Sequence, residues 1–289
     1  MKPAAFTYHR GRDVDGVTRL LRELGEDAKV LAGGQSLVPM MNFRLARPQH
    51  LVDIAGLREL VGIHNDPDGA LRIGALTTHH AVETAPSTRV GRNHAVVREA
   101  MRWVGHLPIR TRGTVGGSLA HADATAEWCL LAILLDAQLT VRGPDGERAV
   151  PAADFFHGYF TTALDSDELL TEIVFPRPAP HSALTEFAER HGDFATVSAA
   201  VSLDLAEDGD TVRGARIVLG GVDALPVRCP EAEAVLSRDR PGTGGVLDEC
   251  AEAAAEHIDP PSDDNGSAHY RRLLTRTLVR RACEEAMTR

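Results

Sequence analysis

The chain has 289 residues, which is enough for two or three compact lobes, each with its own apolar core. Its 43% hydrophobic and 25% charged residues are typical of a folded globular protein and exclude a disordered chain. A formal net charge of -10 argues against a nucleic-acid partner, because a phosphate backbone requires a basic surface and the arginines here are interleaved with acids.

The first predicted elements alternate between helix and strand. Apolar residues at positions 14, 17, 20, 21 and 24 share one helical face, with Asp13 or Asp15 as cap and Gly25 as stop. Strands are predicted at 29–32 and 51–54, with a short helix at 37–43 between them. These elements predict an N-terminal lobe over residues 1–55.

A second lobe is predicted over residues 56–177. It opens with a hairpin, 60–63 and 71–75, around Asp66-Pro67-Asp68-Gly69, and a second hairpin, 138–142 and 147–150, turns at 143–146. Helices are predicted at 81–84, 94–104 and 124–135. This mixture of strands and helices indicates an α+β arrangement.

The segment Arg177-Pro178-Ala179-Pro180 is a predicted linker, since its prolines disfavour both helix and central strand. Strands at 184–190, 197–205 and 215–222 and helices at 231–236, 247–256 and 268–287 follow it. They predict a C-terminal lobe, residues 178–289, of antiparallel sheet plus helices. The Gly-rich stretch 241–245 lies between helices and is interpreted as a loop.

Two glycine-rich turns stand out along the chain: AGGQS at 32–36, after a predicted strand, and TVGGS at 114–118, after a basic run that includes Arg110 and Arg112. Backbone without side chains lets N–H groups approach an anion closely, and the start of a helix after the first turn adds free N–H groups. Together the turns predict a site that holds the diphosphate of a dinucleotide. Neither a GxGxxG fingerprint nor a P-loop is present, so a Rossmann or P-loop site is not indicated.

The four cysteines, at 129, 229, 250 and 283, have no C-x-x-C spacing, which argues against a zinc or iron-sulfur site within this chain. Residues 1–10 lack the apolar core of a signal peptide, and the longest apolar run, 128–135, is too short to span a bilayer. We therefore expect a cytoplasmic protein without direct membrane insertion.

The segments KVLAGGQSLVPMMNFRLARPQHLVDI at 29–54 and IRTRGTVGGSLAHAD at 109–123 closely resemble the FAD-binding medium subunit of the molybdenum hydroxylases, the carbon monoxide dehydrogenase and xanthine dehydrogenase family. The resemblance continues in family order through GALTTH at 74–79, FFHGYF at 155–160, ELLTEI at 168–173, GDFA at 192–195 and YRRLL at 270–274. It implies a three-lobed FAD-binding fold of the vanillyl-alcohol-oxidase-like (PCMH) type, with FAD extended between the first two lobes.

Carried onto this sequence, the resemblance implies contacts to FAD from both turns and from neighbouring segments. The implied residues are Lys29, Ala32, Gly33, Gly34, Gln35, Ser36, Leu37, Thr77, Thr78, Arg112, Thr114, Val115, Gly116, Gly117, Ser118, Asp123, Glu127, Leu170 and Phe194.

Several of these residues also have ordinary structural explanations. Asp123 and Glu127 match acidic positions that bind ribityl or adenosine hydroxyls in the family, although Asp123 is also a candidate helix cap. Thr77 and Thr78 are candidate flavin contacts or caps of the following helix, and Phe194 is either a cover for the flavin ring or a core residue. His79, His80 and His121 are interpreted as structural or surface residues, and no catalytic or metal-binding residue is predicted.

The resemblance implies an electron-transfer subunit that works with a small subunit holding two 2Fe-2S clusters and a large molybdenum-cofactor subunit, as a dimer of heterotrimers. We expect the iron-sulfur subunit to dock near residues 77–80 and 193–194. One alternative is a freestanding FAD-dependent oxidoreductase acting on a small organic substrate, for which Tyr159, His121 or His157 would have to supply a base. A scaffold without redox function is disfavoured because both glycine turns are intact.

Overall fold

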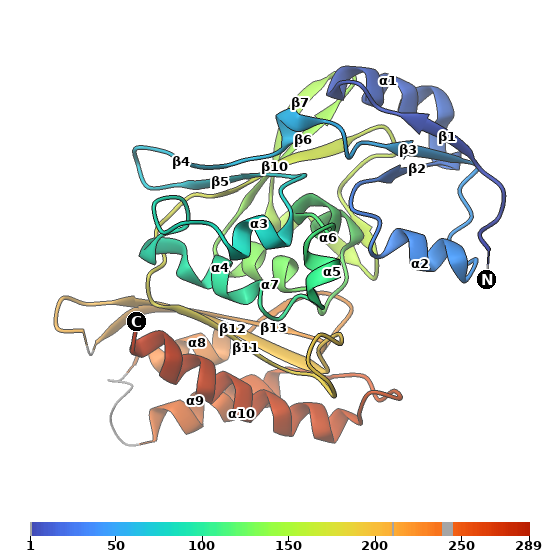
Figure 1. Cartoon of the computed structure of the whole chain (residues 1–289). Helices are drawn as coiled ribbons and strands as arrows, with labels where there is room; N and C mark the ends of the chain where they lie inside the picture. Colours follow the sequence, from blue (N-terminus) through green and yellow to red (C-terminus); the bar gives the residue numbers. More distant parts are fainter. Residues whose placement is uncertain (1, 210, 239–244) are drawn as a thin grey trace.

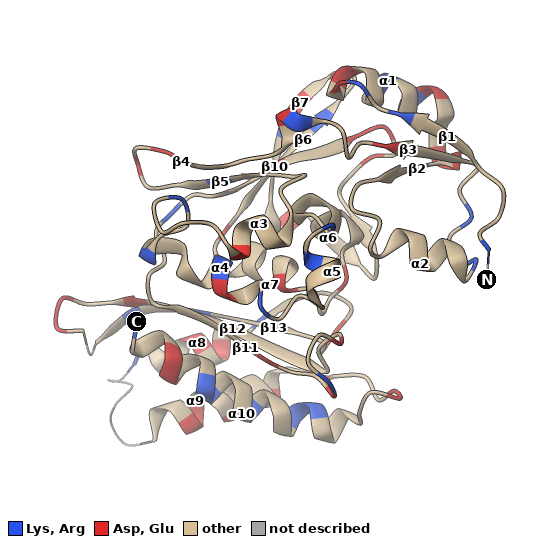
Figure 2. Cartoon of the chain, in the orientation of Figure 1, with Lys and Arg blue, Asp and Glu red and all other residues tan. Residues whose placement is uncertain are grey.

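The computed structural model describes residues 2–209, 211–238 and 245–289 and shows a mixed α and β fold (Figure 1). Three main sheets follow one another along the chain, within residues 7–53, 63–175 and 182–228. The predicted α+β class is confirmed. Acidic and basic residues are interspersed along the elements (Figure 2).

The N-terminal sheet is parallel, in the order β1-β3-β2, and is accompanied by two helices. Asp13 caps the first helix by accepting a hydrogen bond from Gly16 N at 2.7 Å, and Gly25 ends it with φ +62°. These are the cap and stop that the sequence predicts. The elements are β1 (Thr7–Arg10), α1 (Val14–Leu24), β2 (Ala28–Leu31), α2 (Leu37–Asn42) and β3 (His50–Asp53).

The middle sheet is antiparallel, in the order β4-β5-β10-β6-β7, and a layer of helices lies between it and the C-terminal sheet (Figure 1). The strands are β4 (Ile63–Asn65), β5 (Leu71–Gly74), β6 (Gln138–Gly143), β7 (Gly146–Pro151) and β10 (Leu169–Phe175), with a separate small pair β8 (Phe156–Gly158) and β9 (Thr161–Thr162). The helices are α3 (His79–Glu83), α4 (Ala95–Ala100), α5 (Leu107–Arg110), α6 (Val115–His121) and α7 (Glu127–Leu134).

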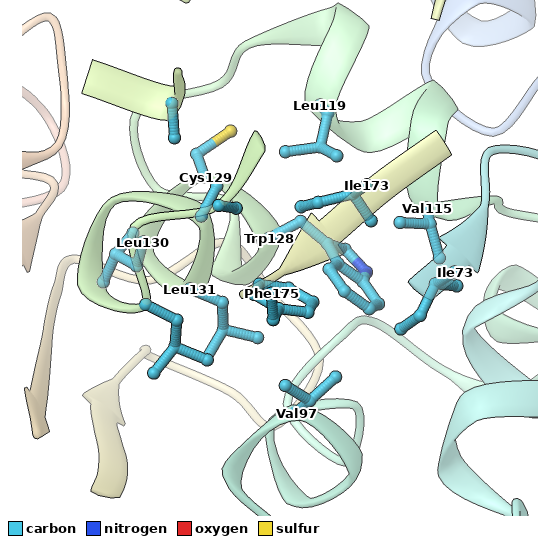
Figure 3. Close-up of a cluster of buried hydrophobic side chains, with 14 of the residues drawn as sticks. Ile73, Val97, Val115, Leu119, Trp128, Cys129, Leu130, Leu131, Ile173 and Phe175 are labelled. Atoms are coloured by element: carbon cyan, nitrogen blue, oxygen red, sulfur yellow. The ribbon is translucent and has the colours of Figure 1, made fainter. Parts of the chain in front are cut away.

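Helix α7 forms the centre of this layer. Nearly all of its residues are buried, as expected for a helix that is apolar on every face. Figure 3 shows Trp128, Leu130 and Leu131 of α7 packed with Phe175 of β10 and Val97 of α4. The middle sheet and the helices packed on it therefore share one core. Helix α7 fixes the position of residues 123–127 at its N-terminal end.

The C-terminal sheet is antiparallel, in the order β11-β12-β13-β14. One face packs against α4 and α7, and α8, α9 and α10 cover the other (Figure 1). The elements are β11 (Ser182–Phe187), β12 (Val197–Leu205), β13 (Val212–Gly220), β14 (Val227–Arg228), α8 (Pro230–Leu236), α9 (Val246–His257) and α10 (Ala268–Met287). Residues 176–181 carry neither helix nor strand, as the predicted linker requires.

Several predicted boundaries are wrong. The first strand of the middle lobe was expected at 60–63 but lies at Ile63–Asn65, because residues 58–60 form a 3-10 turn. The helix expected from 94 to 104 ends at Ala100, and the one expected from 124 begins at Glu127, after a turn at Asp123. The strand expected to reach 222 ends at Gly220, because Gly221 has φ +74°. Positions 241–244 of the predicted Gly-rich loop lie outside the described residues.

Candidate cofactor site

A cavity of about 1490 Å³ lies where the three sheets meet. Its wall includes the first glycine turn, the second glycine turn and residues 192–195 of the C-terminal part. Pockets for drug-sized ligands occupy roughly 300–1,000 Å³. The cavity is therefore large enough for a dinucleotide.

The first glycine turn connects β2 to α2. Gly34 has φ +73°, a conformation that side chains disfavour, and its carbonyl accepts the N–H of Val38 at 3.0 Å. Within the described part of the chain, the backbone N–H groups of Gln35 and Ser36 have no acceptor. They are the donors that the sequence predicts for a diphosphate.

The second glycine turn is the first turn of helix α6, which the sequence did not predict. Thr114 caps this helix by accepting a hydrogen bond from Gly117 N at 3.1 Å. Gly116 packs directly on Ala75, the residue after β5, since a Cβ at this position would lie 2.5 Å from the Ala75 Cβ. Tertiary packing thus outweighs the low helix propensity of the two glycines.

The two glycine turns touch each other. A Cβ on Gly33 would lie 2.2 Å from the Arg112 carbonyl oxygen and 2.8 Å from the Gly113 Cα. No side chain fits in this space, so Gly33 is required for backbone packing between the N-terminal and middle parts. The turns form one continuous stretch of cavity wall.

Carboxylates line the wall beyond the second turn. Asp123 accepts hydrogen bonds from Thr125 N at 2.9 Å and Thr125 Oγ1 at 2.8 Å, so it forms a turn ahead of α7 rather than capping the helix itself. Burial, with a further contribution from the Asp123 charge, raises the pKa of Glu127 to about 7. Both side chains can accept hydrogen bonds from cofactor hydroxyl groups.

Phe194 lies in the cavity wall and is 70% exposed. The interpretation as a core residue is therefore wrong. Asp193 accepts from Arg190 Nε at 2.8 Å, and Gly192, with φ +88°, lies against the His106 ring. This turn exposes the Phe194 ring at the cavity, where the ring can cover a flavin.

Most of the predicted contacts are brought together around the cavity. Those in its wall are Lys29, Ala32, Gly33, Gly34, Gln35, Ser36, Leu37, Thr114, Gly116, Gly117, Ser118, Asp123, Glu127, Leu170 and Phe194.

The other predicted contacts, Thr77, Thr78, Arg112 and Val115, are not in the cavity wall. The Thr77 hydroxyl bonds both backbone groups of Gly62, Thr78 caps α3 and Val115 is fully buried in the middle core. At 1% exposure, Thr77 is also not available to a docking partner.

Arg110 does not serve as a free cation for the cofactor. Its Nε donates to Glu83 at 2.9 Å, and its Nη1 donates to the carbonyls of Val104 and Gly105. The guanidinium ties α5 to α3, so the positive charge that the sequence assigned to an anion site is already paired.

Two histidines lie in the cavity wall, although the sequence indicated structural or surface roles for them. The His121 ring lies against the Phe160 ring, with centroids 4.9 Å apart and planes tilted by 31°, and burial lowers the pKa of His121. His79 is 4% exposed and accepts a hydrogen bond from Trp128 Nε1 at 2.9 Å. Its partner is 49 positions away, so no local pattern could have revealed this pair.

The structure gives no sign of a metal site: no three His, Cys, Asp or Glu side chains are grouped to hold an ion anywhere in the described ranges. All four cysteines are buried as free thiols. No helix in the described part of the chain is long and apolar enough to cross a membrane.

Comparison with known proteins identifies the family. Residues 4–178 match the FAD binding domain in molybdopterin dehydrogenase, and residues 182–286 match the CO dehydrogenase flavoprotein C-terminal domain. The chain is 40% identical to the 6-hydroxypseudooxynicotine dehydrogenase complex subunit alpha of Paenarthrobacter nicotinovorans, over 100% of this chain and 97% of that protein. It is 37% identical to the carbon monoxide dehydrogenase medium chain of Afipia carboxidovorans, over 100% and 99%.

Solved structures of carbon monoxide dehydrogenase and quinoline 2-oxidoreductase support the same family. A carbon monoxide dehydrogenase from Hydrogenophaga pseudoflava matches with a TM-score of 0.94 at 35% identity, covering 100% of this chain and 99% of that chain. Quinoline 2-oxidoreductase from Pseudomonas putida 86 matches with a TM-score of 0.93 at 35% identity, with the same coverage.

The fold and the cavity thus define a flavoprotein of the oxidoreductase class. The chain belongs to the FAD-binding medium subunits of the molybdenum hydroxylase family, and its cofactor is FAD.

Proposed function

We propose that this chain is the electron-transfer subunit of a molybdenum-cofactor dehydrogenase. In this proposal, electrons arrive from an iron-sulfur subunit and leave to an external acceptor, while a large molybdenum subunit oxidises the substrate. FAD supplies the exchange between one-electron and two-electron transfer. Such a complex would be a cytoplasmic dimer of heterotrimers.

The observation that carries the proposal is the composition of the cavity. Its wall offers bare backbone at both glycine turns, carboxylates at Asp123 and Glu127, and an exposed ring at Phe194. These groups bind and cover a dinucleotide, whereas the thiols that would hold an iron-sulfur cluster are buried elsewhere in the cores. In this proposal the electrons for the flavin come from a separate subunit.

The exposed rim suggests where that subunit docks. Phe194 is 70% exposed and Leu107 of α5 is 51% exposed, and Gly105, Ile109 and Phe194 all line the same cavity. Electron transfer requires close approach, so we place the docking surface around residues 105–109 and 193–194. This replaces the sequence expectation, because Thr77 and His79 are buried.

Rapid mixing tests the proposal. The FAD-loaded chain is mixed without oxygen with its proposed iron-sulfur partner subunit in the reduced state, and flavin absorbance is followed. We expect fast bleaching that Leu107→Glu slows without changing FAD content, because Leu107 is exposed on the proposed docking surface and does not line the cavity. Failure of the reduced partner to bleach the flavin would contradict the proposal.

A further inference from the structure

His79 lies at the base of the second glycine turn. It is the first residue of α3, and its backbone N–H donates to the Gly113 carbonyl at 3.1 Å. Its ring is 4% exposed and forms part of the cavity wall, together with Gly113 and Thr114. The imidazole is therefore buried against protein on most sides and open toward the cofactor cavity.

Trp128 determines which ring nitrogen of His79 carries the proton. An indole N–H only donates hydrogen bonds, so the 2.9 Å contact from Trp128 Nε1 requires His79 Nδ1 to accept. The proton of the neutral ring must then be on Nε2. Trp128 is fully buried among Ile73, Val115 and Ile173 (Figure 3), so the donor is held in place by the core.

The protonated edge of the ring faces the glycine turn. A Cβ on Gly113 would lie 2.8 Å from both Nε2 and Cδ2 of His79, so only a residue without a side chain leaves room beside this edge. No acceptor for Nε2 is found within the described ranges. Gly113 in turn lies against Gly33, so the free donor is beside the contact between the two glycine turns.

The charge state of the ring agrees with this geometry. Burial, with a smaller contribution from the Arg110 cation, lowers the pKa of His79 to about 4. At neutral pH the ring is uncharged, which is the state that the Trp128 hydrogen bond requires. The neutral ring therefore places a hydrogen-bond donor, Nε2, in the cavity wall without adding a charge there.

We propose that His79 binds FAD directly, by donating a hydrogen bond from Nε2 to a cofactor oxygen where the two glycine turns meet, and that Trp128 is the positioning residue that fixes the ring. The inference depends on FAD binding in this cavity and is independent of the direction of electron flow. It assigns a cofactor contact to a residue that the sequence indicated as structural.

Two substitutions at His79 separate cofactor binding from a structural role. An asparagine amide replaces the position of Nδ1, and a glutamine amide replaces the position of Nε2. His79→Asn therefore keeps an acceptor for Trp128 but loses the donor toward the cavity. His79→Gln loses the Trp128 acceptor but keeps a donor toward the cavity.

The measurement is the dissociation constant of FAD for the full chain, by titration of flavin fluorescence, beside the unfolding free energy of each apo variant. We expect His79→Asn to bind FAD about tenfold more weakly and His79→Gln to remain within about threefold of the original chain. If His79 were only structural, the order would reverse, with His79→Gln the less stable and weaker binder. Equal affinities of His79→Asn and the original chain would overturn the proposal.

The tautomer is tested separately by nitrogen NMR on the full chain carrying labelled histidine. We expect one neutral His79 signal with the proton on Nε2 in the FAD-loaded chain. Trp128→Phe removes the donor to Nδ1, so both tautomers should appear and FAD affinity should fall. A proton on Nδ1 in the original chain would overturn the assignment, and this result does not depend on how well the variant folds.

Discussion

Gly33 is the residue at which the fold and the cofactor site are most closely connected. Gly33 packs so closely against the Arg112 carbonyl that no side-chain atom fits between them. A Cβ on Gly33 would lie 2.2 Å from that oxygen. Any side chain must push the two glycine turns apart. The same displacement would move the free N–H groups of Gln35 and Ser36 away from the diphosphate.

We predict that Gly33→Ala destabilises the apo chain by about 2 kcal/mol and sharply lowers its FAD content. Urea denaturation and the ratio of flavin to protein absorbance measure the two effects. Gly214→Ala is the matched control, because a Cβ there meets only Asp204 Cβ at 3.9 Å and the position is far from the cavity wall. Full FAD occupancy in Gly33→Ala would contradict the close contact of the turns.

Glu186 is a buried carboxyl whose environment affects how the stability of the chain depends on pH. Its side chain is buried in the C-terminal sheet, and its Oε2 has no hydrogen-bond partner in the described ranges. Burial, with a further contribution from the Glu127 charge, raises its pKa from 4.5 to about 9. The folded chain thus retains a proton that the unfolded chain loses near pH 4.5.

The consequence for stability follows from proton linkage. Stability from this group is fully present below about pH 4.5 and is lost progressively as pH rises toward about 9. We predict that Glu186→Gln raises the unfolding free energy at alkaline pH by about 2 kcal/mol and flattens its decline with pH. Urea denaturation from about pH 5 to about pH 9 tests this. The control is Glu207→Gln at an exposed position, and an unchanged pH slope in Glu186→Gln would refute the prediction.

At the scale of elements, α10 supports the cavity wall from behind the C-terminal sheet. Arg271 of α10 is 3% exposed and donates to the carbonyls of Thr196 and Gly221, and its Nη2 bonds Asp263 at 2.7 and 2.8 Å. Thr196 directly follows the cavity segment 192–195. A single buried guanidinium therefore connects the last helix to the turn that presents Phe194.

We predict that Arg271→Met costs about 3 kcal/mol of stability and also weakens FAD binding, because the Thr196 and Gly221 carbonyls lose their charged donor. Arg276→Met is the control on the same helix, since it removes only a surface ion pair with Glu252 and should cost less than about 1 kcal/mol. Chemical denaturation and FAD titration give the two readouts. Equal effects of the two substitutions would show that α10 does not support the cavity through Arg271.

Elements with clear local signals were predictable from the sequence. The Asp13 cap, the Gly25 stop, the 143–146 hairpin turn and the 268–287 helix all depend on neighbours within a few positions. Helix α6 was missed because its glycines are poor helix formers, and the close contact of Gly116 with Ala75 is not visible in the sequence.

The composition of the site was predictable in part, for the same reason. Glycine turns and the acids after them are local patterns, and both reach the cavity wall. The pairings Arg110 with Glu83, Trp128 with His79 and Gly33 with Arg112 join distant positions, so they depend on the fold. Because of these long-range contacts, Arg110 is paired with Glu83 outside the cavity wall, whereas His79 lies in the wall.

For the whole molecule, the decisive property is dependence on partners. The cavity provides groups suited to binding and covering FAD, but the sequence singles out no base for a substrate, and burial leaves His79 uncharged and already bonded to Trp128. We predict that the isolated chain shows no hydroxylase activity and only slow reoxidation by dyes or oxygen. With its iron-sulfur and molybdenum partners, its flavin should reduce completely when the substrate of the large subunit is added.

Anaerobic spectroscopy of the isolated chain and of the reconstituted complex measures both states. The matched control is a complex whose large subunit lacks its molybdenum cofactor, in which the flavin should stay oxidised after substrate addition but still bleach with a chemical reductant. Turnover of an organic substrate by the isolated chain at about 10 per second, an ordinary enzymatic rate, would instead establish a freestanding flavin oxidoreductase. Because that outcome requires a base at the cavity, His121 would be the first residue to replace, as it is the partly exposed histidine of the wall.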